Sequence, residues 1–140
     1  MGPILLRFAL AIWFGGGLAT ISATRSIFAA AETRKLGGLL AGAVLASFFW
    51  LRWVAAALTA ASWLFVRGAP LWWGTAAAVL TCVHAALDAR IRAFRDQIGG
   101  STEGLAADDP RRKRWGALHA GSVLLLIAQV VCAGAGLAAG

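Results

Sequence analysis

The chain has 140 residues, of which 60% are apolar and 14% are charged, and its mean hydropathy is +0.76. A soluble domain carries about 25% charged residues and buries only about 70% of its surface at this length, so water is an unfavourable solvent for this composition. The long Ala, Val and Leu runs lack the alternation of a transmembrane barrel and predict spanning helices. We therefore expect an all-α integral membrane protein with a single domain, residues 1–140.

The basic residues report the orientation of the chain in the membrane. Thirteen Lys and Arg against six Asp and Glu give a net charge of +7, which in a soluble protein would suggest nucleic-acid binding. Lys and Arg collect in cytoplasmic loops, however, and only Arg7 and Arg67 lie on the side opposite to the loops. Ten others follow the first or the third apolar segment: Arg25, Arg34, Lys35, Arg90, Arg92, Arg95, Arg111, Arg112, Lys113 and Arg114.

This distribution predicts a bacterial inner-membrane protein with both termini outside and with loops 24–35 and 99–114 in the cytoplasm. The lipid bilayer is the expected partner of the basic residues, and no nucleic-acid partner is expected. Four spans are predicted at about residues 4–23, 48–66, 71–89 and 115–138, so the expected architecture is a four-helix membrane bundle. Helices two and three would carry cytoplasmic extensions, because their apolar register continues beyond the spans.

Glycines mark expected helix contacts in the first two segments. Gly15 and Gly16 allow a neighbouring backbone to approach closely, and Gly38 and Gly42 stand at GxxxG spacing. The second apolar run, residues 36–66, contains 31 residues with the single charge Arg52, more than the roughly 20 residues that cross a bilayer. Residues 33–47 are therefore the predicted extension, and we expect lipid or another protein to cover them.

Aromatic residues and arginines mark the expected lipid interface. Phe48 and Phe49 stand with two tryptophans around Arg52, a pattern typical of an aromatic belt with a snorkelling arginine. An internal contact of Arg52 or Arg7 with an anion or substrate is the alternative, since charged groups inside a bilayer are functional candidates. The expected interface residues are Trp50, Arg52, Trp53, Trp72, Trp73, Arg114 and Trp115.

The third and fourth segments are separated by a polar linker. Pro70 is suited to the start of helix three, and Gly99 is expected to end it. The small polar run from Gly99 to Pro110 is the expected mobile linker. Helix four is expected to start near Trp115, and Gly121 provides a further packing position.

Short motifs near both ends resemble one membrane family. LAIWFGG at residues 10–16 resembles the Trp-x-Gly-Gly first helix of the transmembrane-protein-205-like family, and Phe28 with the glycine-rich stretch 37–42 continues that pattern. RWGALHAGS at residues 114–122 resembles the family's basic-aromatic, Leu-His and Ser pattern at the start of the last helix. The order and spacing of these motifs cover most of the chain.

The chain also departs from the family pattern. Thr24 and Arg25 stand where a proline is expected before Phe28, and Leu125 and Ile127 occupy the region of an expected asparagine. The resemblance implies a small bacterial membrane domain of unknown function. A more distant similarity to four-helix copper-resistance and cytochrome b membrane proteins raises the question of a bound metal or haem.

Two histidines are the candidates for chemistry within the membrane. His84 and His119 are expected at the same depth on antiparallel helices, so they could face one another and bind haem or copper, with Asp88 orienting His84. A proton relay is a second interpretation. The third is that each imidazole simply forms hydrogen bonds with a neighbouring helix, for which Ser122, Thr81 or a backbone carbonyl would serve.

The sequence offers no catalytic motif: it lacks a Ser-His-Asp order, paired carboxylates, HExxH and a phosphate loop. No catalytic residue and no resident cofactor are therefore assigned. The leading hypothesis is a non-catalytic accessory or structural subunit that packs with other membrane proteins. The alternative is a small transporter, or a metal-binding or haem-binding membrane protein, that uses His84 and His119.

Overall fold

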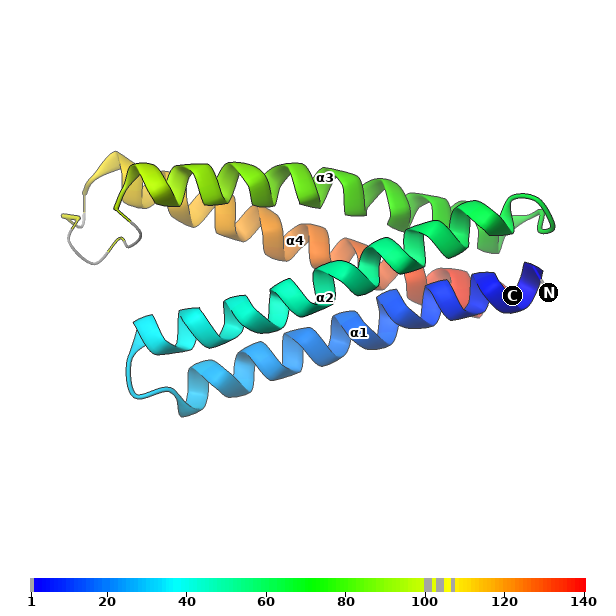
Figure 1. The fold of residues 1–140 in the computed structure, drawn as a ribbon, viewed down its shortest axis with the longest axis horizontal. Coiled ribbons are helices and arrows are strands. Elements are labelled where there is room, and N and C mark those ends of the chain that lie inside the picture. The colour runs from blue at the N-terminus through cyan, green and yellow to red at the C-terminus, as the bar shows by residue number, and fades with distance from the viewer. Residues whose placement is uncertain (1, 100–101, 103–104, 107) are drawn as a thin grey trace.

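Four long helices make up the described part of the chain (Figure 1). The computed structural model describes residues 2–99, 102, 105–106 and 108–140. In order, α1 covers Gly2–Ala30, α2 Arg34–Ser62, α3 Ala69–Gln97 and α4 Pro110–Ala138, each with 29 residues. All four are long and apolar enough to cross a membrane, which confirms the all-α class and the number of candidate spans.

Local sequence signals explain where the helices begin. The side chain of Thr33 accepts a hydrogen bond from the backbone N–H of Leu36, 3.2 Å away, and so caps α2. Gly68 precedes α3 with a φ of 102°, a left-handed conformation that a residue with a Cβ rarely adopts. Pro70 follows in the first turn of α3, where a missing N–H costs no hydrogen bond.

The helix boundaries correct several expected ones. Residues 24–30 are helical, so residues 31–33 alone connect α1 to α2. The second helix ends at Ser62 and not at residue 66, and the fourth begins at Pro110, so Arg111 to Arg114 belong to a helix instead of a loop. The expected mobility of the linker 99–110 concerns residues of which 100–101, 103–104 and 107 lie outside the described part of the chain.

The helices are arranged as two antiparallel pairs, α1 with α2 and α3 with α4 (Figure 1). Both ends of the chain and the turn between α2 and α3 lie at one end of the bundle, which we call the terminal end. The connection 31–33, the end of α3 and the start of α4 lie at the opposite end, which we call the loop end. The two pairs are packed together at the terminal end and diverge toward the loop end (Figure 1).

The apolar core occupies the half of the bundle nearest the terminal end. Its buried residues are Leu6, Ala9, Leu10, Trp13, Ala55, Leu71, Ala77 and Ala133. Glycines allow this close packing: Gly17 lies against Val130, and a Cβ on Gly74 would lie 2.9 Å from a methyl carbon of Leu6. The indole N–H of Trp13 donates to the Thr81 hydroxyl at 3.2 Å, which ties α1 to α3.

The length of α2 does not distinguish it from the other helices. At 1.5 Å per residue each helix is about 44 Å long, more than the roughly 30 Å hydrocarbon core of a bilayer. All four helices therefore exceed the hydrocarbon core in length, and helix tilt is one way in which a bilayer accommodates the excess. The long run of apolar residues is still specific to α2, since α3 and α4 carry several charged residues in their loop-end turns. Within the expected extension of α2, Phe28 of α1 covers Gly37, whereas the side chain of Leu39 is 64% exposed.

Candidate functional site

Arg52 is buried inside the bundle, so the prediction that it snorkels to the lipid interface was wrong. Its side chain is only 3% exposed, and it stands near the middle of α2. The rings of Phe48 and Phe49 pack on the guanidinium, with their centroids 5.5 and 5.6 Å from Cζ. The aromatic residues around Arg52 therefore include two that cover its charge in the interior.

Arg52 belongs to a group of four polar side chains from three helices. Its Nη1 lies 2.6 Å from Nδ1 of His84 on α3, and its Nη2 lies 3.7 Å from a carboxylate oxygen of Asp88, one turn further along α3. Nε2 of His84 lies 2.7 Å from the hydroxyl oxygen of Ser122 on α4. We call Arg52, His84, Asp88 and Ser122 the polar cluster.

The contacts of the cluster determine the protonation state of His84. An arginine guanidinium only donates hydrogen bonds, so Nδ1 of His84 must accept the bond from Arg52. The imidazole is therefore neutral, its proton is on Nε2, and that N–H donates to Ser122. Asp88 lies 3.5 Å from the same Nε2, which agrees with the expected orientation of His84 by a carboxylate one turn away.

The charges of the cluster cancel. Neutral His84 is 2% exposed, Arg52 carries a positive charge, and Asp88 carries the compensating negative charge and is 24% exposed. Buried charges in an apolar surrounding require such a partner, because an isolated one would cost several kcal/mol, on the order of 5 or more. The Nε of Arg52 has no hydrogen-bond partner among the described residues.

Two more buried polar side chains lie on the terminal side of the cluster. Thr59 follows Arg52 by seven residues on α2, and Gln129 follows Ser122 by seven on α4. Seven residues make two turns, so both stand about 10 Å further along the same helix faces. Gln129 is 1% exposed, and neither its amide atoms nor the Thr59 hydroxyl has a partner within the described part of the chain. Buried groups of this kind are commonly satisfied by internal water.

The expected pairing of the two histidines does not form. Both ring nitrogens of His84 are engaged by the cluster, whereas His119 is exposed on α4. The described residues contain no group of three or more His, Cys, Asp or Glu side chains suited to a metal ion. A haem or copper ion bound by His84 would have to displace Arg52 or Ser122, so the contacts of His84 fit the interhelical hydrogen-bond interpretation best.

The expected packing glycines fall into two groups. Phe48 lies against Gly16, and a Cβ on Gly121 would lie 3.4 Å from Leu87, so these two serve contacts within the bundle. Gly15, Gly38 and Gly42 instead face open space, with no described atom within 4 Å of a Cβ built on them.

The expected interface tryptophans are mainly on the outside of the bundle. Trp72 and Trp73 are exposed in the first turn of α3, at the terminal end. Trp50 and Trp53 are also exposed, but they lie near the middle of α2 instead of at one end. Trp115 is half-buried at the loop end.

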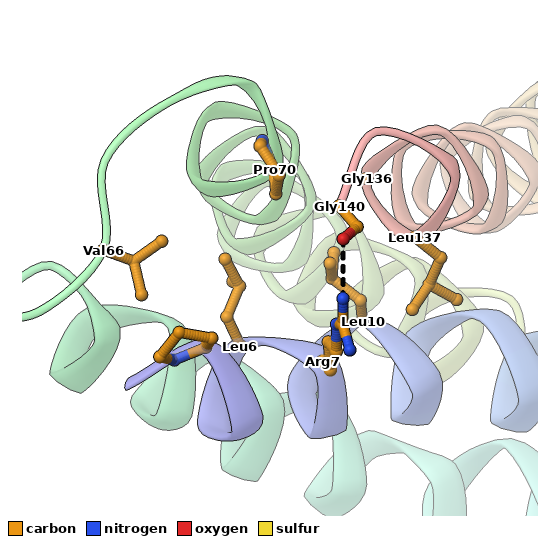
Figure 2. Close-up of a pocket in the computed structure, with 9 residues that line it drawn as sticks. Leu6, Arg7, Leu10, Val66, Pro70, Gly136, Leu137 and Gly140 are labelled. Carbon is orange, nitrogen blue, oxygen red and sulfur yellow. Dashed lines mark hydrogen bonds between the residues drawn. The ribbon is translucent and has the colours of Figure 1, made fainter. Parts of the chain in front are cut away.

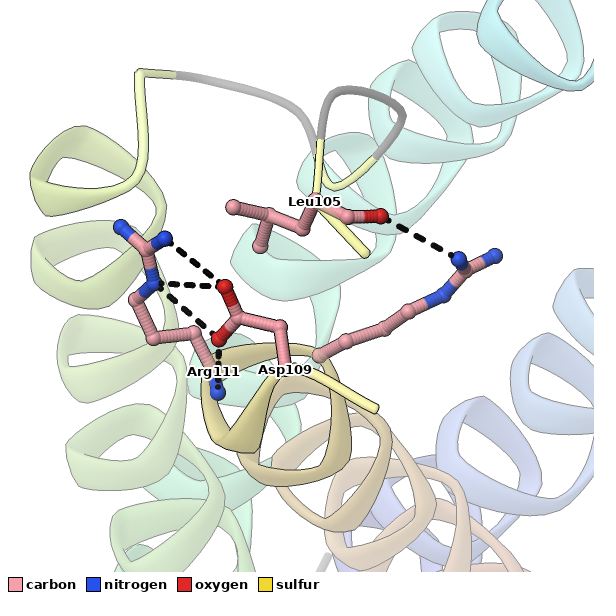
Figure 3. A network of polar contacts seen from close by, with 4 residues as sticks. Leu105, Asp109 and Arg111 are labelled. Atoms are coloured by element: carbon pink, nitrogen blue, oxygen red, sulfur yellow. Dashed lines mark hydrogen bonds and ion pairs between the residues drawn. The ribbon is translucent and has the colours of Figure 1, made fainter. Parts of the chain in front are cut away.

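A local ion-pair network begins α4 at the loop end (Figure 3). The Asp109 carboxylate accepts from the backbone N–H of Arg111 at 2.8 Å and from its guanidinium at 2.8 Å. The hydrogen bond from the Arg111 side chain lowers the pKa of Asp109 below its ordinary value of 3.8. One turn into the helix, the Cζ of Arg114 stacks 4.9 Å from the ring centroid of Phe94 on α3.

A small pocket lies at the terminal end, between α1, the start of α3 and the end of α4 (Figure 2). Its volume is about 150 Å³, and its lining is apolar apart from Arg7. Nη2 of Arg7 donates to the backbone oxygen of Gly140 at 2.6 Å, which joins the start of α1 to the end of the chain. Arg7 is exposed, and its expected position near an interface stays a prediction.

Comparisons of the chain with protein-family models, curated proteins and solved structures found no match. The resemblance of residues 10–16 and 114–122 to the transmembrane-protein-205-like family therefore stays a prediction.

Sequence reasoning placed Asp88 beside His84 and named Ser122 as one of three possible partners, but it missed Arg52 as a member of the cluster. The signal that could have found it is helical spacing. Ala41, Phe48, Ala55 and Thr59 are buried on one face of α2, and Arg52 falls within that series at three to four residues from its neighbours.

Proposed function

We propose that this chain is a non-catalytic integral membrane protein that packs as an accessory or structural subunit of a larger membrane complex. The observation that carries this proposal is the pair Gly38 and Gly42 on α2. Both are exposed and face open space. By contrast, a side chain from a neighbouring helix of the same chain lies against each of Gly16, Gly17 and Gly74. In a bilayer, small residues four apart are the positions at which helices approach most closely.

The surroundings of the glycine pair support the same proposal. Leu36, Leu39 and Leu40 are exposed beside it, in the part of α2 that lies where the helix pairs diverge (Figure 1). Lipid tails are as apolar as leucine, so exposed leucines alone are compatible with lipid. The glycines favour a second helix over lipid as the partner of this face. A helix gains close backbone contact where a side chain is missing, whereas a lipid gains nothing from it.

We place the loop end on the cytoplasmic side of a bacterial inner membrane. Arg90, Arg92 and Arg95 of α3 are exposed there, as are the four basic residues that begin α4. This distribution follows the excess of Lys and Arg in cytoplasmic segments, and both ends of the chain then lie outside. Each basic residue near anionic headgroups contributes about 1 kcal/mol to membrane association.

Native electrophoresis after gentle detergent extraction tests the subunit proposal. The tagged wild-type chain should migrate in a complex much larger than a single 14.5 kDa chain in detergent. Gly42→Leu should release it from that complex, because a leucine would occupy the proposed contact. Ala57→Leu is the matched control, since Ala57 is also exposed on α2 but lies nearer the terminal end. Migration of the wild-type chain alone would contradict the proposal.

A small transporter is the second candidate, and the polar cluster is the observation that favours it. Charged groups inside a bilayer commonly lie on the paths of ions or polar substrates. His84→Ala should then abolish transport, whereas His119→Ala should leave it unchanged because His119 lies outside the cluster. Equal behaviour of the two variants and the wild type would exclude this candidate.

A further inference from the structure

The polar cluster joins the two helix pairs near the middle of α2. Arg52 comes from the α1–α2 pair, whereas His84, Asp88 and Ser122 all come from the α3–α4 pair. Both contacts of Arg52 within the cluster therefore cross between the pairs. The contacts of His84 with Ser122 and Asp88 stay within the second pair.

The observed arrangement requires a neutral His84. A protonated imidazole donates at both nitrogens and offers no lone pair, so it could not accept the bond that Arg52 now donates to Nδ1 at 2.6 Å. The hydrogen bond would become a repulsive contact between two cations. A proton on His84 and the observed position of Arg52 are thus mutually exclusive.

The groups around His84 determine how a proton would change the balance of charge. Arg52 faces it from α2, Asp88 from its own helix and Ser122 from α4. On the side of α1, Trp13 donates to Thr81 one turn before His84 and brings no charge. With His84 neutral the cluster has no net charge, and with His84 protonated two cations would compete for the single carboxylate of Asp88.

The carboxylate is placed to change partner. One oxygen of Asp88 lies 3.7 Å from Arg52 and the other lies 3.5 Å from Nε2 of His84, so a protonated His84 could take over the ion pair without moving along α3. Arg52 would then be the unpaired cation. Because the Arg52 guanidinium is attached to α2, the repulsion is relieved when α2 moves away from α3. Such a movement would widen the existing divergence of the two pairs toward the loop end (Figure 1).

We propose that His84, together with Asp88, is a binding site for one proton, and that uptake of this proton separates the α1–α2 pair from the α3–α4 pair at the loop end. This inference does not depend on the subunit proposal, since it concerns the isolated chain. The separated state binds the proton more tightly than the closed state, so acidification favours separation. One coupled proton changes that equilibrium by at most about tenfold per pH unit.

Pulsed electron spin resonance on the full chain in lipid nanodiscs tests the proposal. The native cysteines are replaced (Cys82→Ala, Cys132→Ala), and spin labels are attached through Leu39→Cys on α2 and Arg92→Cys on α3, both exposed near the loop end. Between about pH 8 and about pH 5, the range in which histidine titrates, the distance between the labels should lengthen reversibly by several ångströms. A distance that does not respond to pH would overturn the proposal.

Three variants identify the titrating group. His84→Gln keeps one acceptor and one donor but cannot bind the proton, so the distance should stay at its closed value throughout. His119→Ala, the matched control, should respond as the wild type does. Asp88→Asn removes the charge that balances Arg52 and should lengthen the distance already at about pH 8. An undiminished pH response in His84→Gln would overturn the proposal.

A second measurement keeps the test decisive if His84→Gln does not fold. The ¹⁵N signals of the His84 ring, assigned by comparison with His119→Ala, report its protonation in the otherwise unmodified chain. The midpoint of that titration should coincide with the midpoint of the distance change. Midpoints that differ by more than about one pH unit would show that another group drives the motion and would overturn the proposal.

Discussion

The two halves of the bundle are held together by different interactions. Toward the terminal end, Leu6, Leu10 and Trp13 of α1 pack against α3 and α4, and glycines such as Gly74 and Gly136 bring the backbones close. Toward the loop end the pairs diverge (Figure 1), and Arg52 joins them through its hydrogen bond with His84 and its ion pair with Asp88. Lipid competes with apolar contacts in a bilayer, so close packing and hydrogen bonds must supply the association.

The comparison shows that hydrophobicity does not decide which part of this bundle is closely packed. Leu39 in the loop half is as apolar as Leu10 in the terminal half, but the first is exposed and the second is fully buried. The difference lies in the residues opposite: Leu10 contacts Gly136, whereas no side chain of another helix covers the neighbouring Gly38. Four predictions test this contrast.

The largest effect is expected in the terminal half. Trp13→Ala should lower the free energy of unfolding by roughly 3 kcal/mol or more, because it empties a fully buried site and removes the bond to Thr81. Phe28→Ala, in the loop half where Phe28 is half exposed, should cost less than about 1 kcal/mol. Unfolding measured in lipid bicelles would compare the two, and equal losses would contradict the contrast.

The polar cluster should show non-additive effects. Arg52→Leu should destabilise the bundle by about 3 kcal/mol, because it leaves the Asp88 carboxylate without its cation in the interior. The double variant Arg52→Leu with Asp88→Leu should recover more than half of that loss, since no charge then stays unpaired. A double variant as unstable as the sum of its single variants would show that the ion pair does not matter.

Replacing glycine by alanine should change the stability of the bundle in opposite directions in the two halves. Gly17→Ala should destabilise by about 1 to 3 kcal/mol, because its Cβ would clash with the stiff branched side chain of Val130. Gly42→Ala should be neutral or stabilising by up to about 1 kcal/mol in the isolated chain, since its Cβ enters open space and alanine favours a helix. Thermal unfolding of both variants in the same detergent would measure this difference, and losses of similar size would contradict it.

The smallest effect concerns the start of α4. The hydrogen bond from Arg111 lowers the pKa of Asp109 below 3.8, so the cap stabilises the helix above that pH and is lost as the pH falls through the lowered value. Hydrogen exchange of the first α4 amides should therefore accelerate only in strong acid. Asp109→Ala should accelerate it already at neutral pH, and unchanged exchange in that variant would show that the cap is not formed.

Much of the fold could be predicted from the sequence, because hydropathy and the length of an apolar run report membrane helices directly. The ends of the helices could not, since residues 24–30 and 111–114 carry charges that suggest a loop although they remain helical. Hydropathy reports contact with lipid. A helix continues beyond the lipid wherever its backbone hydrogen bonds can still form. Thr33 and Asp109, which cap the helices, were the better signals.

The site was predicted in part. Asp88 one turn after His84, and Ser122 as a partner on α4, follow from helical spacing and from the antiparallel order of the last two helices. Arg52 was misplaced because arginine among aromatic residues is more common at an interface than inside a bundle. Its burial depends on how α2 rotates against α1 and α3, which a single sequence does not specify.

The central claim is that His84 is neutral, carries its proton on Nε2 and accepts the Arg52 hydrogen bond at Nδ1, since both the closed bundle and the proposed proton binding depend on this form. The ¹⁵N spectrum of the imidazole at about pH 8, where an isolated histidine is neutral, tests this claim most directly. We predict a single tautomer with the proton on Nε2 and with Nδ1 accepting a hydrogen bond, and Arg52→Leu should remove the signature of that bond. A proton on Nδ1, or a spectrum that Arg52→Leu leaves unchanged, would contradict the account.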